Sequence, residues 1–115
     1  MKKLTDFCWR ADSDSVEWAF AARRIKKSYP FPIRSAITLL DNTGVALVEP
    51  NEVSKPNNAV IFNADGSERF RVMHPGQGAD GGFDQIYYVR HELTAFAGQQ
   101  GRSDQRQLLL QLDDN

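Results

Sequence analysis

NAVIFNADGSERFRVM, residues Asn58–Met73, is the clearest structural signal in the chain. Residues 59–62 are a short apolar run rich in β-branched and aromatic side chains, and residues 69–72 alternate charged and apolar side chains with a period of two. Between these segments lie Asn63 and Asp65, which can hydrogen-bond the local backbone, and Gly66, which can adopt the positive φ that such turns require. This stretch therefore predicts a β-hairpin.

The rest of the chain from Ile33 onward carries the same kind of signal. Ile33–Leu40 and Val45–Val48 flank a turn that, like the first, ends in glycine, and they predict a second hairpin. Further strands are expected at 83–90, 93–97 and 105–112. With about seven short strands, we expect a mainly β protein: a single domain over residues 1–115, built as an antiparallel meander, sandwich or small barrel. The predicted core consists of Val60, Phe62, Phe70, Val72, Ile86, Tyr88 and Leu110, with Arg69 and Arg71 directed to solvent.

Val16–Lys27 fits two structures. As a strand, it places Val16, Trp18 and Phe20 on one face. As a helix, it could begin at Asp14, and it would carry its basic residues at the carboxyl end, where the helix dipole favours them. We favour a helix over about residues 15–28, and the strand stays open as the alternative.

Composition places the chain among ordinary globular proteins. It has 115 residues, of which 41% are hydrophobic and 25% charged, and its net charge is −1. The single cysteine, Cys8, excludes an internal disulfide and fits a reducing compartment. The apolar stretch near the N-terminus is too short for a signal peptide, and no run is long enough to span a membrane. We expect a cytoplasmic, bacterial protein.

The charge is unevenly distributed along the chain. Residues 1–35 contain eight basic and four acidic residues, whereas residues 36–115 contain six basic and eleven acidic residues. This asymmetry either lets the first segment fold against the acidic remainder or provides a basic contact surface. The candidate partner contact comprises Arg23, Arg24, Lys26 and Lys27. We expect another protein as the partner, not nucleic acid, and the sequence leaves a homodimer open.

Residue patterns that carry catalysis or metal binding are weak. His74 and His91 have no partner at a recognised ligand spacing, so we expect no metal and no cofactor. Cys8 lies between aromatic residues, as a small buried hydrophobe would. The glycine-rich loop 74–82 precedes a strand and carries Asp80, which disfavours phosphate. If a ligand pocket exists, its candidate lining residues are His74, Gln77 and Asp80.

One segment resembles a known repeat. The pattern from Asn58 to Gly66, followed by Glu68–Arg71, resembles a blade of the quinoprotein-type β-propellers, and 93–97 and 108–113 look like further strands of that kind. The resemblance covers about residues 58–113. Because the chain is too short for a propeller, it implies a local β-meander and no quinone site, metal or activity. The chain is otherwise similar in style to small bacterial β proteins.

These observations favour a non-catalytic protein-interaction module, such as a bacterial adaptor or an immunity-type protein. The alternative is a small-ligand binder or enzyme whose pocket is lined by the 74–82 loop. A pocket with convergent polar groups would favour the alternative, and a broad charged face would favour the interaction module.

Overall fold

The computed structural model describes residues 3–50, 52–53, 57–73, 83, 85–89, 92–97 and 106–109. These residues form ten strands and no helix, and therefore no helix among them could cross a membrane. The prediction of a mainly β protein is confirmed. The strands are β1 (Thr5–Cys8), β2 (Ser15–Phe20), β3 (Arg23–Ser28), β4 (Ser35–Thr38), β5 (Gly44–Val48), β6 (Ala59–Asn63), β7 (Glu68–Arg71), β8 (Gln85–Val89), β9 (Glu92–Ala97) and β10 (Arg106–Leu109).

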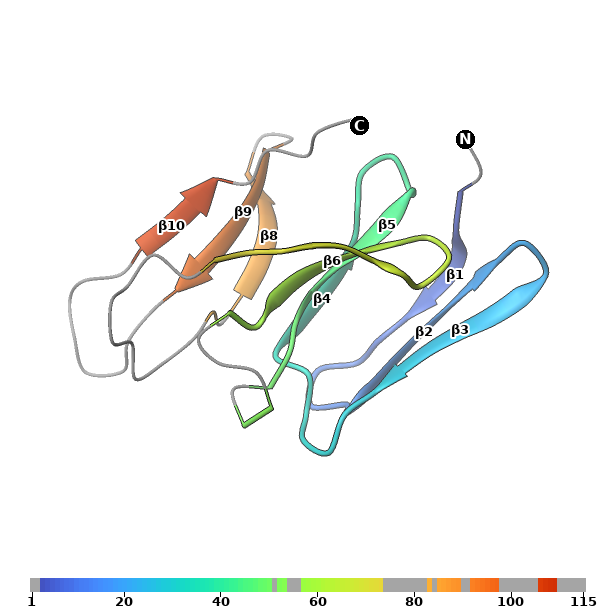
Figure 1. Ribbon diagram of the computed structural model, residues 1–115, viewed down its shortest axis with the longest axis horizontal. Helices are drawn as coiled ribbons and strands as arrows, with labels where there is room; N and C mark the ends of the chain where they lie inside the picture. The colour runs from blue at the N-terminus through green and yellow to red at the C-terminus, as the bar shows by residue number, and fades with distance from the viewer. Residues whose placement is uncertain are drawn as a thin grey trace.

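The strands form three antiparallel sheets that succeed one another along the 45 Å long axis of the molecule (Figure 1). Sheet A has the order β1-β2-β3, sheet B the order β4-β5-β6-β7 and sheet C the order β10-β9-β8. Each sheet consists of strands that are consecutive in the sequence, and neighbouring strands in the sheet follow one another along the chain. The arrangement is a three-layered meander with sheet B in the middle.

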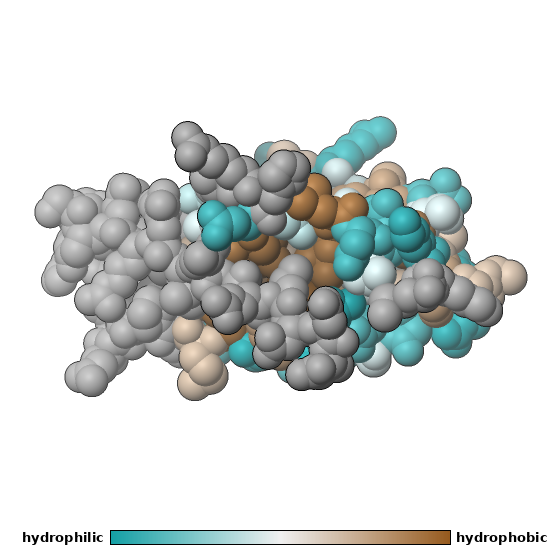
Figure 2. Space-filling model, turned by 90° about the horizontal axis from the view of Figure 1, so that it is seen from above, coloured by the Kyte–Doolittle hydropathy of each residue, from teal (hydrophilic) through white to brown (hydrophobic). Residues whose placement is uncertain are grey.

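Sheet B is buried on both faces, which explains why its central strands are apolar without alternation. All five residues of β5 and the first four of β6 are buried. Strands covered on both sides require apolar residues at successive positions. Figure 2 shows hydrophobic residues near the middle of the molecule and hydrophilic ones toward the end formed by sheet A.

Two separate apolar clusters fill the spaces on either side of sheet B. The cluster facing sheet C contains Ile61, Val72 and Ile86, and the cluster facing sheet A contains Trp18, Leu47 and Phe62. Val60, Phe62, Val72 and Ile86 are thus buried as predicted, Phe70 and Tyr88 are partly buried, and Leu110 lies outside the described residues. The predicted core residues fall into both clusters, because β6 directs alternate side chains into two different layers.

The Asn58–Met73 hairpin is confirmed as β6 and β7. Gly66 has φ +93°, and its amide donates to the Asn63 carbonyl oxygen at 2.9 Å. A Cβ atom on Gly66 would lie 2.9 Å from Cγ2 of Ile25, so glycine is required both by the backbone conformation and by the close approach of β3. Arg69 and Arg71 are half-buried rather than directed freely into solvent, because both are hydrogen-bonded.

The predicted N-terminal helix over about residues 15–28 is wrong: this segment is the hairpin β2–β3. Its two turn residues, Ala21 and Ala22, have φ of 51° and 63°, as a two-residue turn between twisted strands requires. Val16 and Trp18 are completely buried, and the indole Nε1 of Trp18 donates to the Ala64 carbonyl oxygen at 2.7 Å. Burial of this alternate face against sheet B outweighs the helix propensity of the alanines and basic residues.

Candidate functional site

Strand β3, which carries the predicted contact residues, forms an outer edge of sheet A (Figure 1). The amide of Tyr29 donates to the Asp14 carbonyl oxygen at 2.9 Å, directly after the last cross-strand pair of β2 and β3. Along an edge strand, residues whose backbone groups bond to the neighbouring strand alternate with residues whose backbone groups point away from it. The backbone groups of Arg23, Ile25 and Lys27 therefore bond to β2. The backbone groups of Arg24, Lys26 and Ser28 therefore face the open edge.

Three of the four basic side chains of β3 are exposed. Arg24 forms an ion pair with Glu17 on the neighbouring strand at 3.3 Å, and both side chains remain substantially exposed, at 51% and 39%. Arg23 and Lys26 are also exposed, and neither forms an ion pair with a carboxylate of the described residues. The result is a basic strand edge, which we define as Arg23, Arg24 and Lys26.

Lys27 has a different environment from the other three. It lies on the inner side of β3 and is partly buried, with its Nζ atom 4.6 Å from the centre of the Phe62 ring. A cation over an aromatic face is stabilised by the ring quadrupole. Lys27 therefore contributes to the packing of sheet A on sheet B as well as to the charge of the edge.

Arg23 also influences the turn of the neighbouring hairpin. The pKa of Asp65 lies below its ordinary value, mainly because Ser67 donates to it from both its hydroxyl and its amide, and to a lesser degree because of the charge of Arg23. Asp65 thus receives its hydrogen bonds from its own turn, and it forms no ion pair with Arg23. Arg23 remains available for contact with another molecule.

Strand β3 is the longest and most regular of the edge strands described. It pairs with β2 over six residues without a register shift, whereas β1 and β7 each have four residues and an irregular register. Strand β8 has five residues, and its Ile86 exchanges contacts of 3.4 Å with the Ser35 hydroxyl of β4. Among the sheet edges, β3 therefore presents the longest regular row of backbone groups.

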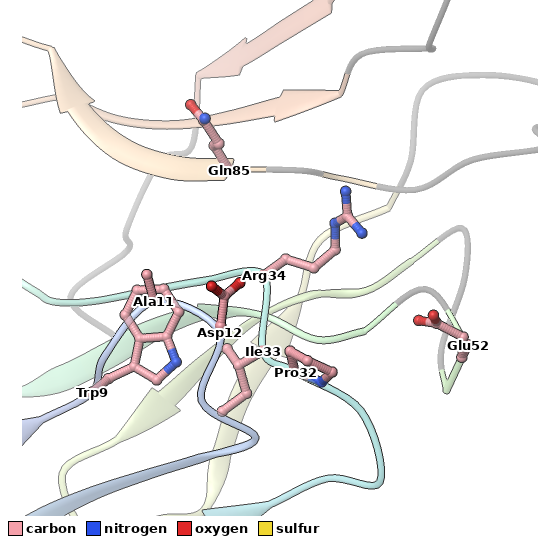
Figure 3. Close-up of a pocket in the computed structure, with 8 residues that line it drawn as sticks. All are labelled: Trp9, Ala11, Asp12, Pro32, Ile33, Arg34, Glu52 and Gln85. Carbon is pink, nitrogen blue, oxygen red and sulfur yellow. The ribbon is translucent and has the colours of Figure 1, made fainter.

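A groove of about 470 Å³ is the second candidate site (Figure 3). Gln85 from sheet C lies across this groove from Trp9 and Asp12, which belong to the loop between β1 and β2. Its lining residues are Trp9, Ala11, Asp12, Pro32, Ile33, Arg34, Glu52 and Gln85. Both charge signs are present, which suits a small polar molecule, but the described lining residues include no cysteine, histidine, serine or threonine to act as a nucleophile or imidazole base.

The other predicted site residues are only partly accounted for. His74, Gln77 and Asp80 lie outside the described residues, as does His91. Cys8 is exposed rather than buried. Among the residues that the structure does describe, no group of three or more His, Cys, Asp or Glu side chains could hold a metal ion.

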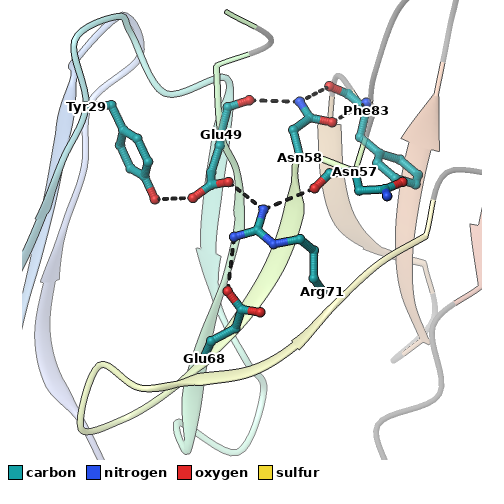
Figure 4. A network of polar contacts seen from close by, with 7 residues as sticks. All are labelled: Tyr29, Glu49, Asn57, Asn58, Glu68, Arg71 and Phe83. Carbon is teal, nitrogen blue, oxygen red and sulfur yellow. Dashed lines mark hydrogen bonds and ion pairs between the residues drawn. The ribbon is translucent and has the colours of Figure 1, made fainter. Parts of the chain in front are cut away.

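A partly buried polar network connects the layers, and no pattern in the sequence predicted it (Figure 4). The Glu49 carboxylate, which follows β5, accepts from the Tyr29 hydroxyl at 2.7 Å and from the Arg71 guanidinium at 2.5 Å. Arg71 also bonds to Glu68 at 3.0 Å. Glu49 is thereby held between the end of sheet A and the outer strand of sheet B.

Asn58 extends this network toward sheet C. Its side-chain amide donates to the backbone carbonyl oxygens of Glu49 and Phe83, and its Oδ1 accepts from the Phe83 amide at 2.6 Å. Asn58 is completely buried, and buried polar groups are stable only when hydrogen-bonded. The described residues contain no buried side-chain nitrogen or oxygen without a partner, so we assign the network a structural role.

The network shifts two pKa values. Burial, followed by the hydrogen bond to Glu49, raises the pKa of Tyr29 far above its ordinary value near 10. Burial alone would lower the pKa of Arg71, but its bonds to Glu49 and Glu68 raise it. Both shifts favour the neutral Tyr29 hydroxyl and the charged Arg71 guanidinium, which are the forms that donate hydrogen bonds to the Glu49 carboxylate.

Comparison with models of known families, with curated proteins and with solved structures finds no match to this chain. The resemblance to propeller blades therefore stays a prediction. What the basic strand edge and the groove do has to be inferred from their own geometry and charge.

Proposed function

We propose that the chain is a non-catalytic protein-interaction module, of the adaptor or immunity type, that contacts an acidic surface of its partner through β3. The observation that carries this proposal is the basic strand edge of Arg23, Arg24 and Lys26 on β3, an edge strand of sheet A. The side chains of Arg23 and Lys26 are exposed, and neither forms an ion pair with an acid among the described residues, so both can meet carboxylates of a partner. A cytoplasmic location in a bacterium is part of the proposal.

Such a surface acts mainly on the rate of association. Charged groups on a rim attract an oppositely charged partner over a distance of about 10 Å, and salt screens that attraction. Packing of the apolar layers is not screened in this way. We therefore expect the charges of β3 to affect binding and its salt dependence much more than they affect stability.

The test compares two double variants with the same net charge. Arg23→Glu/Lys26→Glu reverses two side chains of the basic strand edge and leaves both members of the Arg24–Glu17 ion pair in the sequence. Lys3→Glu/Arg10→Glu reverses two exposed residues outside β3 and serves as the control. A partner captured from the native host with the wild-type protein is then titrated against all three proteins at low and high salt.

The proposal predicts that the β3 variant associates about tenfold more slowly at low salt and loses most of its salt dependence, while the control stays close to wild type. Equal rates for the two variants would show that β3 is not the contact. Turnover of a small substrate that His74→Ala abolishes would overturn the non-catalytic assignment.

A further inference from the structure

We propose that β3 binds its partner by strand addition: an extended acidic segment of the partner pairs with the open edge of sheet A as a fourth strand. This inference rests on the proposed function and adds the form of the bound segment and its chemistry. Two independent features of β3 carry it, the direction of its backbone groups and the spacing of its charges.

The backbone of β3 offers hydrogen-bonding groups that no other residue in the described part of the chain uses. Arg24, Lys26 and Ser28 direct their amides and carbonyls away from β2, and no described group bonds to them. Three residues with two groups each can form about six backbone hydrogen bonds with an added strand. The six residues of β3 span roughly 20 Å, the length of an ordinary strand.

The side chains select which strand can be added. Arg24 and Lys26 lie two residues apart and point to the same face, so an added strand with acids at alternate positions would place a carboxylate opposite each of them. On the other face the central position of β3 is the partly buried Ile25, which favours an apolar residue beside it. The best-fitting segment therefore alternates acidic and apolar residues.

The same charges disfavour other occupants. A second copy that paired through β3 would bring basic side chains opposite basic side chains, which is destabilising. Binding of single-stranded nucleic acid uses exposed aromatic rings for stacking, but the aromatic rings on the strands of this sheet pack inward: Trp18 is completely buried, and Phe7 and Phe20 are partly buried against the core. Basic residues on a strand edge thus prevent self-association and leave an acidic strand as the partner.

The probe is the blocked peptide Thr-Glu-Val-Glu-Val-Glu-Thr, tested on the full chain by amide hydrogen exchange. In the free protein the amides of Arg24, Lys26 and Ser28 should exchange quickly, whereas those of Ile25 and Lys27 should exchange slowly. Peptide at saturation should slow exchange at the first three amides by about tenfold or more and leave the other two unchanged. A peptide with Gln in place of Glu, and one N-methylated at each Glu, serve as controls that should bind weakly.

Two variants at one position separate the backbone from the charge. Lys26→Ala and Lys26→Pro lose the same charge, but only proline also removes the outward amide, and proline is tolerated at such edge positions. We expect Lys26→Pro to bind the peptide about three- to tenfold more weakly than Lys26→Ala. Circular dichroism of both variants confirms that each is folded.

Each outcome decides between the two proposals. Protection of Arg24, Lys26 and Ser28 supports strand addition. Binding of the acidic peptide without that protection, or equal affinity of the two Lys26 variants, would overturn strand addition and leave a basic contact surface. Failure of the peptide to bind overturns strand addition too, and the charge-reversal variants then decide whether β3 contacts the partner at all.

Discussion

Gly66 shows how far a single residue can be predicted from its neighbours in the sequence. The polar residues before it and the strands on either side predicted a turn with positive φ, and its φ is +93°. The close approach of Ile25 to Gly66 was not predictable, because these residues lie in different hairpins whose packing no local pattern reveals. Local turn chemistry is encoded over a few residues, whereas the contact depends on the stacking of sheets A and B.

Tyr29 provides a prediction at the same scale. Its raised pKa means that the folded protein keeps this proton at pH values at which the unfolded chain releases it. The stabilisation is therefore complete below about pH 10, the pKa of an unperturbed tyrosine, and decreases as the pH rises above that value. Tyr29→Phe removes the titrating group and the hydrogen bond to Glu49 together.

The measurement is the free energy of unfolding in urea, between about pH 8 and pH 11, for wild type and Tyr29→Phe. At pH 8 the variant should be less stable by about 1–3 kcal/mol, since a buried carboxylate loses a hydrogen bond. Above about pH 10 the difference between the two proteins should shrink. A difference that stays constant or grows with pH would contradict the assigned role of Tyr29.

The hairpin β2–β3 illustrates the limits of prediction at the scale of an element. Val16, Trp18 and Phe20 carried the strand signal, but Ala21 and Ala22 lack the Asn-Gly chemistry that normally marks a two-residue turn. Alanine, arginine and lysine are strong helix formers, so local preference favoured the wrong element. Burial of Val16 and Trp18 against sheet B decided the structure, and that information is not local.

The same turn yields a prediction in which the direction of the stability change depends on whether the segment is a hairpin or a helix. Ala21→Asn/Ala22→Gly should stabilise the protein by about 1–2 kcal/mol, because Asn and Gly adopt positive φ with less strain than alanine. If the segment were a helix, the same change would destabilise it by about 1 kcal/mol or more.

Thermal and urea unfolding of the double variant provide the measurement. Ala19→Gly, at a strand position of the same hairpin, is the matched control and should lower stability by about 0.5–1 kcal/mol. A loss of stability in the turn variant would contradict the hairpin. Since the charges of β3 are unchanged, peptide binding by the turn variant should equal that of wild type.

At the scale of the whole molecule, the β class was predictable but the layering was not. The runs at 45–48 and 59–62 contain no polar residue, which is the signature of strands buried on both faces, and a middle sheet could have been inferred from them. The polar network had no such signal. Tyr29, Glu49 and Arg71 are about twenty residues apart in the sequence and come together only when sheets A and B stack.

The candidate site, too, was predictable from the sequence only in part. The four basic residues were found from the sequence alone, because a cluster of like charges is a local feature. Their arrangement as an open strand edge could not be found while residues 15–28 were expected to be a helix, since a helix has no edge. Both proposals for function therefore depend on the assignment of β3 as an edge strand.

The measurement that tests this assignment most directly is amide hydrogen exchange along residues 15–29 of the free protein at neutral pH. The structure predicts alternation in β3, with slow exchange at Arg23, Ile25, Lys27 and Tyr29 and fast exchange at Arg24, Lys26 and Ser28. Continuous protection from Ala21 through Ser28 would indicate a helix, or an edge already covered by another strand, and would contradict the open edge on which the proposed binding depends.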